Sequence, residues 1–181
     1  METLTFFPTI VWSTQCSLDN EKYFKLVKDF QQKTDISYSS NQGGYQGYEF
    51  NDQEFYDEVA NLVPTLKEND FKSKIYAWVN VNGKGHSNNK HSHFTSDILI
   101  SGVYYVKVPE DSGNIRFYDP RGELIHKTLD WQYYHNYQYH YIKPKEGQMI
   151  FFPCWLEHDV EPSKSNDERI SIAFNVSMIG D

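Results

Sequence analysis

The sequence predicts a mainly β fold of the jelly-roll kind, a sandwich or barrel, with helices confined to the N-terminal third. After Asp70 about eight short apolar or aromatic runs follow one another, with turn residues and no helical pattern between them. Tyrosine, phenylalanine and tryptophan make up 17% of the chain, and these side chains favour strands.

The length of 181 residues suits one domain with a core of its own, and no linker or internal repeat divides the chain. We therefore expect a single domain over 1–181, with helical support at about 15–70 and a β core at about 73–179.

Charge and hydropathy argue against two classes of partner. The formal charge is −8 and the acidic residues are spread along the chain, which disfavours binding of long nucleic acid. No apolar run approaches the roughly 20 residues of a membrane span, and the first residues, METLTFFPTIVW, lack a secretion signal. Cys16 and Cys154 are too few for a disulfide framework, so we expect a reducing, cytoplasmic setting.

The N-terminal third is predicted to begin with a strand and a helix. The strand covers Leu4–Trp12, with Pro8 near an edge. Behind the candidate N-caps Ser17 and Asp19, apolar residues recur at helical spacing, which predicts a helix at about 19–33.

A loop and a second helix are expected next. The stretch 34–50 is polar and contains glycines, which is typical of a loop. Asp52 then caps a helix whose last turn Pro64 makes doubtful and whose apolar stripe comprises Phe55, Val59, Leu62 and Leu66.

The remaining elements are strands. A turn-rich segment, Gly83–Lys90, separates the first of them from the sequence His91-Ser92-His93. The predicted strands are Lys74–Asn82, Leu99–Val108, Asn114–Tyr118, Tyr137–Ile142, Gln148–Phe152, Glu157–Val160 and Arg169–Ser177.

His91 and His93 form the sharpest local pattern among the seven histidines. On a strand, residues two apart point to the same face, so the pair could hold one metal ion. His158 is the natural third ligand from a distant strand, and three ligands on one face leave positions open for catalysis. On the pair alone, two solvent-facing histidines in a polar loop remain an alternative.

Arg169 and Ser171 also share a strand face. A guanidinium and a hydroxyl can together bind a carboxylate through charge-assisted hydrogen bonds. The pair follows His158 across a polar turn, so the two strands are expected to be neighbours. A surface arginine paired with Asp167 or Glu168 is the alternative.

The order of these motifs is similar to that of the Fe(II)/2-oxoglutarate-dependent oxygenases. More narrowly, the chain resembles a family of them known mostly from bacterial and phage genomes. The resemblance covers nearly the whole chain. It rests on Phe7–Trp12, Trp78-Val79-Asn80, Asn88–His93, Ser101–Tyr105, Asp119-Pro120-Arg121, Gly147–Pro153, His158 and Arg169–Asn175.

The resemblance implies a double-stranded β-helix, a cupin-like jelly roll, in the cytoplasm of a bacterium or a phage-infected host. It implies Fe(II), 2-oxoglutarate and O2 as cofactor and co-substrates, with His91 and His158 binding the iron. Arg169 would pair with the distal carboxylate of 2-oxoglutarate, assisted by the side chains of Ser171 and Tyr105. The apolar side chains that would line the co-substrate pocket are Val103 and Ile115.

The third metal ligand departs from the pattern of the superfamily. Asp or Glu usually stands two residues after the first histidine, whereas this chain has His93. Three arrangements are open: a three-histidine set, Asp97 reaching in from the loop, or His93 as the first ligand. We favour the set His91, His93 and His158.

The resemblance implies hydroxylation of a C–H bond with release of succinate and CO2. The substrate is a small molecule or a protein side chain that the sequence does not identify, and it leaves the oligomeric state open. Two alternatives compete: a non-catalytic jelly-roll binding protein and a metal-dependent hydrolase. The hydrolase is disfavoured because Asp97 follows His93 too late for the H-x-H-x-D pattern.

Overall fold

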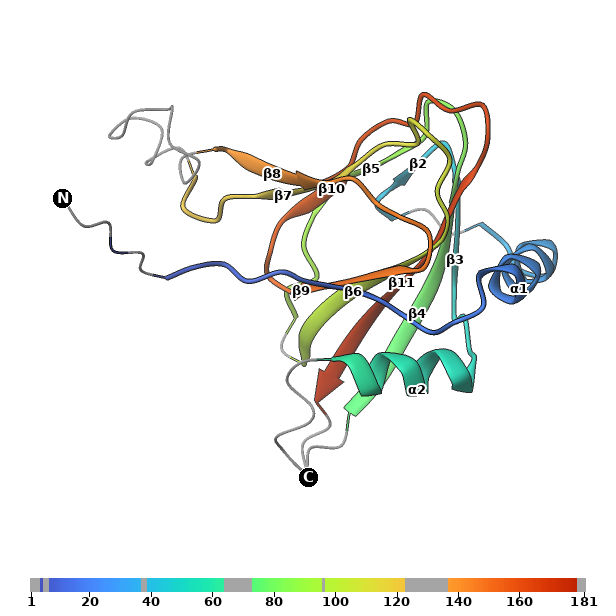
Figure 1. The fold of residues 1–181 in the computed structure, drawn as a ribbon, viewed down its shortest axis with the longest axis horizontal. Helices are drawn as coiled ribbons and strands as arrows, with labels where there is room; N and C mark the ends of the chain where they lie inside the picture. The colour runs from blue at the N-terminus through green and yellow to red at the C-terminus, as the bar shows by residue number, and fades with distance from the viewer. Residues whose placement is uncertain are drawn as a thin grey trace.

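The computed structural model describes residues 4, 7–36, 39–63, 73–95, 97–122 and 137–178. They form two antiparallel sheets that face one another, with both helices on the outer side of the larger sheet (Figure 1). The predicted mainly β fold, with helices in the N-terminal third, is confirmed. No helix in these ranges is long and apolar enough to cross a membrane.

Within the described ranges, eleven strands build the two sheets. The larger sheet has the order β1 (Trp12–Gln15), β9 (Gln148–Pro153), β6 (Ile98–Lys107), β11 (Arg169–Met178), β4 (Ser73–Asn82) and β3 (Tyr45–Tyr48). The smaller sheet has the order β2 (Asn41–Gln42), β5 (Ser87–His91), β10 (His158–Val160), β7 (Ile115–Tyr118) and β8 (Tyr139–Ile142).

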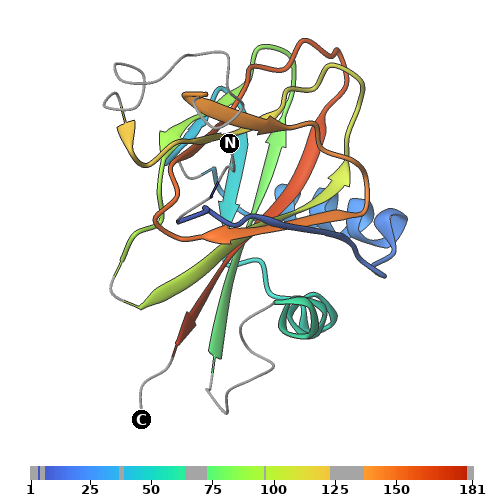
Figure 2. The same ribbon diagram turned by 60° about the vertical axis from the view of Figure 1, so that its left-hand side comes forward.

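The long strands β4, β6 and β11 form the centre of the larger sheet, and in Figure 2 they cross the molecule with helix α2 beside them. Strand β11 has β4 and β6 along its two edges, and both of its faces are buried, one by the helices and the other by the smaller sheet. Its even-numbered residues, including Ile170, Ile172 and Phe174, pack toward the helices. Its odd-numbered residues, Arg169, Ser171 and Ala173, point into a cavity between the sheets.

Both helices begin at the aspartates that the sequence indicated. The Asp19 side chain accepts hydrogen bonds from two backbone N–H groups of α1 (Asn20–Lys33), and Asp52 accepts one from Phe55 of α2 (Gln53–Leu62). Each cap contributes about 1 kcal/mol. The helices bury one apolar face on the larger sheet through Tyr23, Val27, Phe55 and Val59.

The seven strands predicted after Asp70 are confirmed to within two residues at each end. Three other predictions were wrong. Strand β1 begins at Trp12 instead of ending there, the predicted loop 34–50 contains β2 and β3, and the turn-rich segment 83–90 contains most of β5. The missed strands are short or polar, so their sequences carry no apolar alternation. Leu66 and Pro64 lie outside the described residues.

Candidate active site

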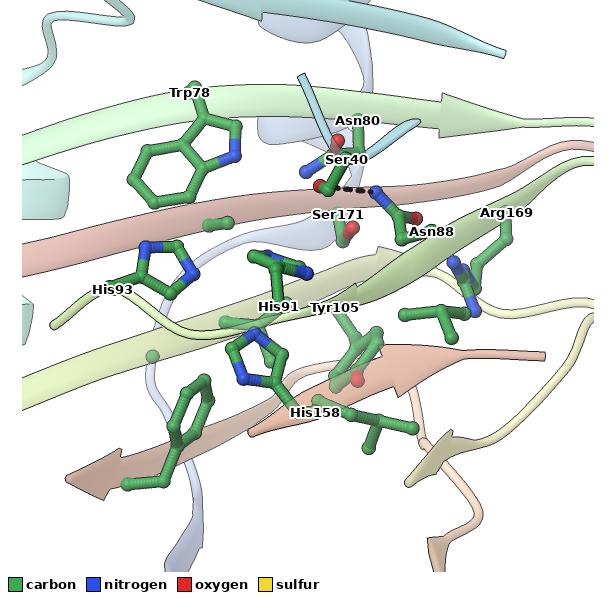
Figure 3. Close-up of a pocket in the computed structure, with 16 residues that line it drawn as sticks. Ser40, Trp78, Asn80, Asn88, His91, His93, Tyr105, His158, Arg169 and Ser171 are labelled. Atoms are coloured by element: carbon green, nitrogen blue, oxygen red, sulfur yellow. Dashed lines mark hydrogen bonds between the residues drawn. The ribbon is translucent and has the colours of Figure 1, made fainter. Parts of the chain in front are cut away.

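Three histidine side chains converge in the cavity between the sheets (Figure 3). The ring centroids of His91 and His158 are 4.4 Å apart, those of His91 and His93 5.0 Å, and those of His93 and His158 5.2 Å. One nitrogen of each ring lies within 4.8 Å of one nitrogen of each of the others. This spacing lets the three rings share one metal ion.

Strand pairing brings these residues together. His91 ends β5 and His158 begins β10, and the two are direct partners in the antiparallel register. His93 follows two residues later, and its backbone N–H donates to the carbonyl oxygen of Cys154 at 2.8 Å. The loop after β5 is thereby fastened to the turn before β10.

Backbone carbonyls select the tautomer of two of the rings. The Nδ1–H of His91 donates to the carbonyl oxygen of Asn89 at 2.6 Å, and the Nδ1–H of His158 donates to that of Leu156 at 2.9 Å. Because a carbonyl oxygen can only accept, the proton resides on Nδ1 and the lone pair on Nε2. Each Nε2 is therefore available to a metal ion.

Burial keeps the three rings uncharged at neutral pH. Desolvation, together with the nearby His91 ring, lowers the pKa of His158 to about 3 and that of His93 to about 4. The pKa of His91 is also lowered, chiefly by burial. Neutral imidazole is the form that binds metal ions.

The third ring, that of His93, is oriented by Trp78. Its indole stacks on the imidazole of His93, with centroids 5.4 Å apart and ring planes 25° from parallel. On its other side His93 lies parallel to His158, at an interplanar angle of 7°. Within the described part of the chain, the His93 ring has no hydrogen bond of the kind that orients His91 and His158, so these two neighbouring rings hold it in place.

Arg169 lies at the opposite end of the cavity (Figure 3). Its side chain is 2% exposed, and Nη1 donates to the carbonyl oxygens of Ser112 and Gly113 at 3.4 and 3.3 Å. Its Nε has no hydrogen-bond partner among the described residues. Within those residues no carboxylate forms an ion pair with it. A buried cation with an unused donor is a site for an anionic ligand.

All the residues of the favoured site line this one cavity. The three histidines occupy one end and Arg169 the other, and Tyr105, Ser171, Val103 and Ile115 lie on the walls. Burial raises the pKa of Tyr105 to about 12, so its hydroxyl keeps its proton and can donate. The cavity therefore joins a cluster of neutral nitrogen ligands to a cationic anchor.

The acidic candidates near the histidines lie elsewhere. Asp97 is exposed and accepts a hydrogen bond from Thr95 at 3.0 Å. Asp159 faces away from the cavity, where Arg116 Nε donates to it at 2.7 Å and the Tyr118 hydroxyl at 2.8 Å. Among the described residues, the one cluster able to hold a metal ion is the three-histidine set.

Sequence reasoning missed a polar row on β4. Trp78 and Asn80 line the cavity and Asn82 lies beside Arg169, whereas Val79 and Val81 between them pack into the core. With its amide oxygen turned to Arg169, Asn82 accepts from Nη2 at 2.9 Å. The signal was present in the sequence: asparagines alternate with valines in a strand that is apolar enough to be buried on both faces.

Comparison with known proteins places the chain in a family. The family model described as "Putative 2OG-Fe(II) oxygenase" matches residues 76–175, which include every residue of the cavity named above. A search of curated proteins found no match.

Solved structures share the fold at low sequence identity. A prolyl-4-hydroxylase from Pseudomonas putida is 14% identical, covers 95% of this chain and 94% of its own, and has a TM-score of 0.66. A viral collagen prolyl hydroxylase from Paramecium Bursaria Chlorella virus-1, in complex with 2-oxoglutarate, is 19% identical over 93% and 96%, with a TM-score of 0.63.

The carbocyclase SnoK of nogalamycin biosynthesis, described as non-heme and α-ketoglutarate dependent, has a TM-score of 0.68 at 13% identity, covering 96% of this chain and 81% of its own. These likenesses confirm the double-stranded β-helix. From the family match, the chain belongs to the 2OG-Fe(II) oxygenases, enzymes that use Fe(II), 2-oxoglutarate and O2.

Proposed function

We propose that this oxygenase hydroxylates a C–H bond of its substrate, with His91, His93 and His158 as iron ligands and Arg169 as the anchor of 2-oxoglutarate. One observation carries the proposal: a single cavity holds three converging neutral imidazoles at one end and a buried guanidinium at the other. We also infer from the sequence that the whole chain forms one domain. The cavity lies inside that domain.

The donor set fits a ferrous ion. Imidazole nitrogen is a ligand that suits Fe(II), and two of the three rings already have Nδ1 bound to a carbonyl oxygen, which leaves Nε2 for the metal. His91 and His158 would be oriented by those hydrogen bonds, and His93 by its contact with Trp78. The protein needs little reorganisation to bind the ion, because the rings already converge.

The arginine end fits a dicarboxylic acid. Arg169 Nε has no partner among the described residues, so a carboxylate could accept from it without displacing a protein acceptor. Ser171 and Tyr105 can add hydroxyl donors, since both line the cavity. Val103 and Ile115 offer apolar surface to the methylene groups between the two carboxylates.

The residues of the chain would bind and orient iron and 2-oxoglutarate, and they exclude water from the cavity. When bound, iron and 2-oxoglutarate supply the activation of O2 that oxidises a C–H bond, with succinate and CO2 as products. The cavity walls keep the reacting groups away from bulk solvent, since Tyr105, Phe152 and Ile115 are each at most 3% exposed. The substrate class stays open between a small molecule and a protein side chain, because prolyl hydroxylases and a carbocyclase share this fold.

Release of succinate tests the proposal. The protein, supplied with Fe(II), 2-oxoglutarate and O2, should form succinate even without a known substrate, at the slow rate of uncoupled turnover. Omitting Fe(II) should abolish it. A non-catalytic binding protein would bind 2-oxoglutarate without forming succinate, and that outcome would refute the oxygenase function.

A further inference from the structure

The cavity has an unbalanced charge. Its lining residues within the described part of the chain include a cation, Arg169, but no acidic side chain. The acids that flank the histidines in sequence are engaged elsewhere: Asp159 with Arg116, and Glu157 with Lys90 at 2.7 Å. Asp97 is exposed at the surface.

The net charge of the cavity stays at one positive charge when iron and 2-oxoglutarate bind, but the distal carboxylate neutralises Arg169 and the remaining charge then belongs to the metal end, so an inference drawn from it rests on the proposed function. The histidines contribute no charge as metal ligands. A ferrous ion adds a double positive charge and Arg169 a single one, while 2-oxoglutarate adds a double negative charge. A single positive charge is left over, because His93 stands where a carboxylate would neutralise it.

An uncompensated charge in a buried cavity is costly, and an ion of opposite sign stabilises it strongly at low dielectric. Solvent screens such a charge only in part, since His158, Arg169 and Tyr105 are each at most 5% exposed while His91 and His93 are half-buried. The protein around the cavity is acidic overall, with a formal charge of −8, so the positive charge is local to the cavity.

A second observation is a polar atom on the wall of the same cavity, without a partner in the described part of the chain. Asn80 is 7% exposed and lines the cavity, and its amide oxygen has no hydrogen-bond partner among the described residues. It lies on β4 two residues from Trp78, the residue that stacks on His93. That oxygen is an acceptor, and Asn80 is the direct register partner of Ser171; with the amide turned over, its nitrogen could donate to an anion instead.

We propose that the substrate of this oxygenase carries an anionic group, of the carboxylate type, which binds beside His93 and supplies the negative charge that the three-histidine set lacks. The substrate class is thus narrowed to acids, whether a free small molecule or an acidic side chain. His93 would act as a specificity-determining residue in addition to a metal ligand.

Acetate and its uncharged isostere acetamide are the probes. The protein is loaded anaerobically with Fe(II) and saturating 2-oxoglutarate, and each probe is titrated by calorimetry at constant ionic strength while retention of 2-oxoglutarate is measured. Acetate should bind and acetamide should bind at least about tenfold more weakly, since only acetate neutralises the charge. Equal binding of both probes, or no binding of acetate, would overturn the inference.

A matched pair of variants isolates the charge at position 93. His93→Asn and His93→Asp differ by one negative charge and almost nothing in shape. Acetate should bind the Asp variant at least about tenfold more weakly than the Asn variant. Equal acetate affinity in the two variants would contradict the proposal.

Failure of the proposed function can be distinguished from failure of this inference. If the wild-type protein binds neither Fe(II) nor 2-oxoglutarate, the oxygenase site is wrong and this inference falls with it. If both bind and acetate does not, the inference alone is refuted.

Discussion

The two ends of the cavity differ in charge, although burial acts on both. At the histidine end, burial removes charge: it lowers the pKa values of His93 and His158 far below the ordinary value and leaves neutral rings. At the other end, Arg169 remains a cation because its intrinsic pKa is too high for burial to discharge it, although burial lowers that pKa. One end is therefore prepared for a metal cation and the other for an anion.

The two ends are also held differently. The histidines depend on local backbone contacts, since His91 and His158 each bind the carbonyl two residues earlier. Arg169 depends on other segments of the chain: the carbonyls of Ser112 and Gly113 in the loop before β7, and the amide of Asn82 at the end of the neighbouring strand β4. We expect changes at one end to leave ligand binding at the other end partly intact.

The largest expected effect is at the histidine end. His158→Ala removes a buried ligand, so Fe(II) affinity should fall by at least about 100-fold, as loss of a metal ligand leaves an incomplete coordination set. Metal titration by calorimetry measures it. His86→Ala, which changes a histidine outside the cavity, is the control and should bind Fe(II) as the wild type does. If the His158→Ala variant binds Fe(II) as tightly as the wild type, His158 is not a metal ligand.

A smaller loss of Fe(II) affinity is expected for a change at Trp78, which lies beside the histidines. Trp78→Leu removes the ring that stacks on His93, so Fe(II) affinity should fall by about 3- to 10-fold while His91 and His158 still bind. Trp155→Leu changes an exposed tryptophan and serves as the control. If both variants bind Fe(II) equally well, the stacking does not position His93.

A separate prediction concerns pH and the metal-free protein. Because the folded-state pKa values of His93 and His158 lie below the unfolded value of about 6.5, the unfolded state binds more protons between about pH 6.5 and 4. Stability should therefore be complete above about pH 6.5 and should decline as the pH falls through this window. Thermal melts from pH 7.5 to 4 measure the decline.

His93→Asn isolates the contribution of one ring to that decline. The variant lacks one group that must be protonated on unfolding, so its melting temperature should fall less steeply with acid than that of the wild type. An identical pH profile in the two proteins would mean that His93 is already charged when folded.

The sequence predicted both ends of the cavity and part of its walls, but not the row of polar side chains on β4. The pairs His91/His93 and Arg169/Ser171 were predictable because residues two apart share a strand face, and all four line the cavity. The same rule applied to Asn80 and Asn82, but alternating asparagines were not recognised as a buried polar face. The stacking of Trp78 on His93 joins β4 to the loop after β5, and such a contact depends on how the sheets face one another.

The strands that sequence analysis missed have a common physical reason. Strand β5, with the sequence SNNKH, owes its conformation to pairing with β10 and β2 and not to apolar alternation. Asn88 in it is buried, yet it packs as a polar group that donates to the Ser40 hydroxyl at 3.3 Å. A polar buried strand of this kind has no distinctive local pattern.

The central claim is that one cavity binds a metal ion and a dicarboxylic acid together, through the two ends described above. Calorimetric titration of N-oxalylglycine, an analogue of 2-oxoglutarate, into the Fe(II)-loaded wild type and its Arg169→Ala variant tests it most directly, with Arg121→Ala, at an exposed arginine, as control. We expect Arg169→Ala to weaken the analogue by about 10- to 100-fold, because charge-assisted hydrogen bonds are lost, and to leave Fe(II) affinity unchanged. Equal affinity for the analogue in wild type and Arg169→Ala would contradict the account.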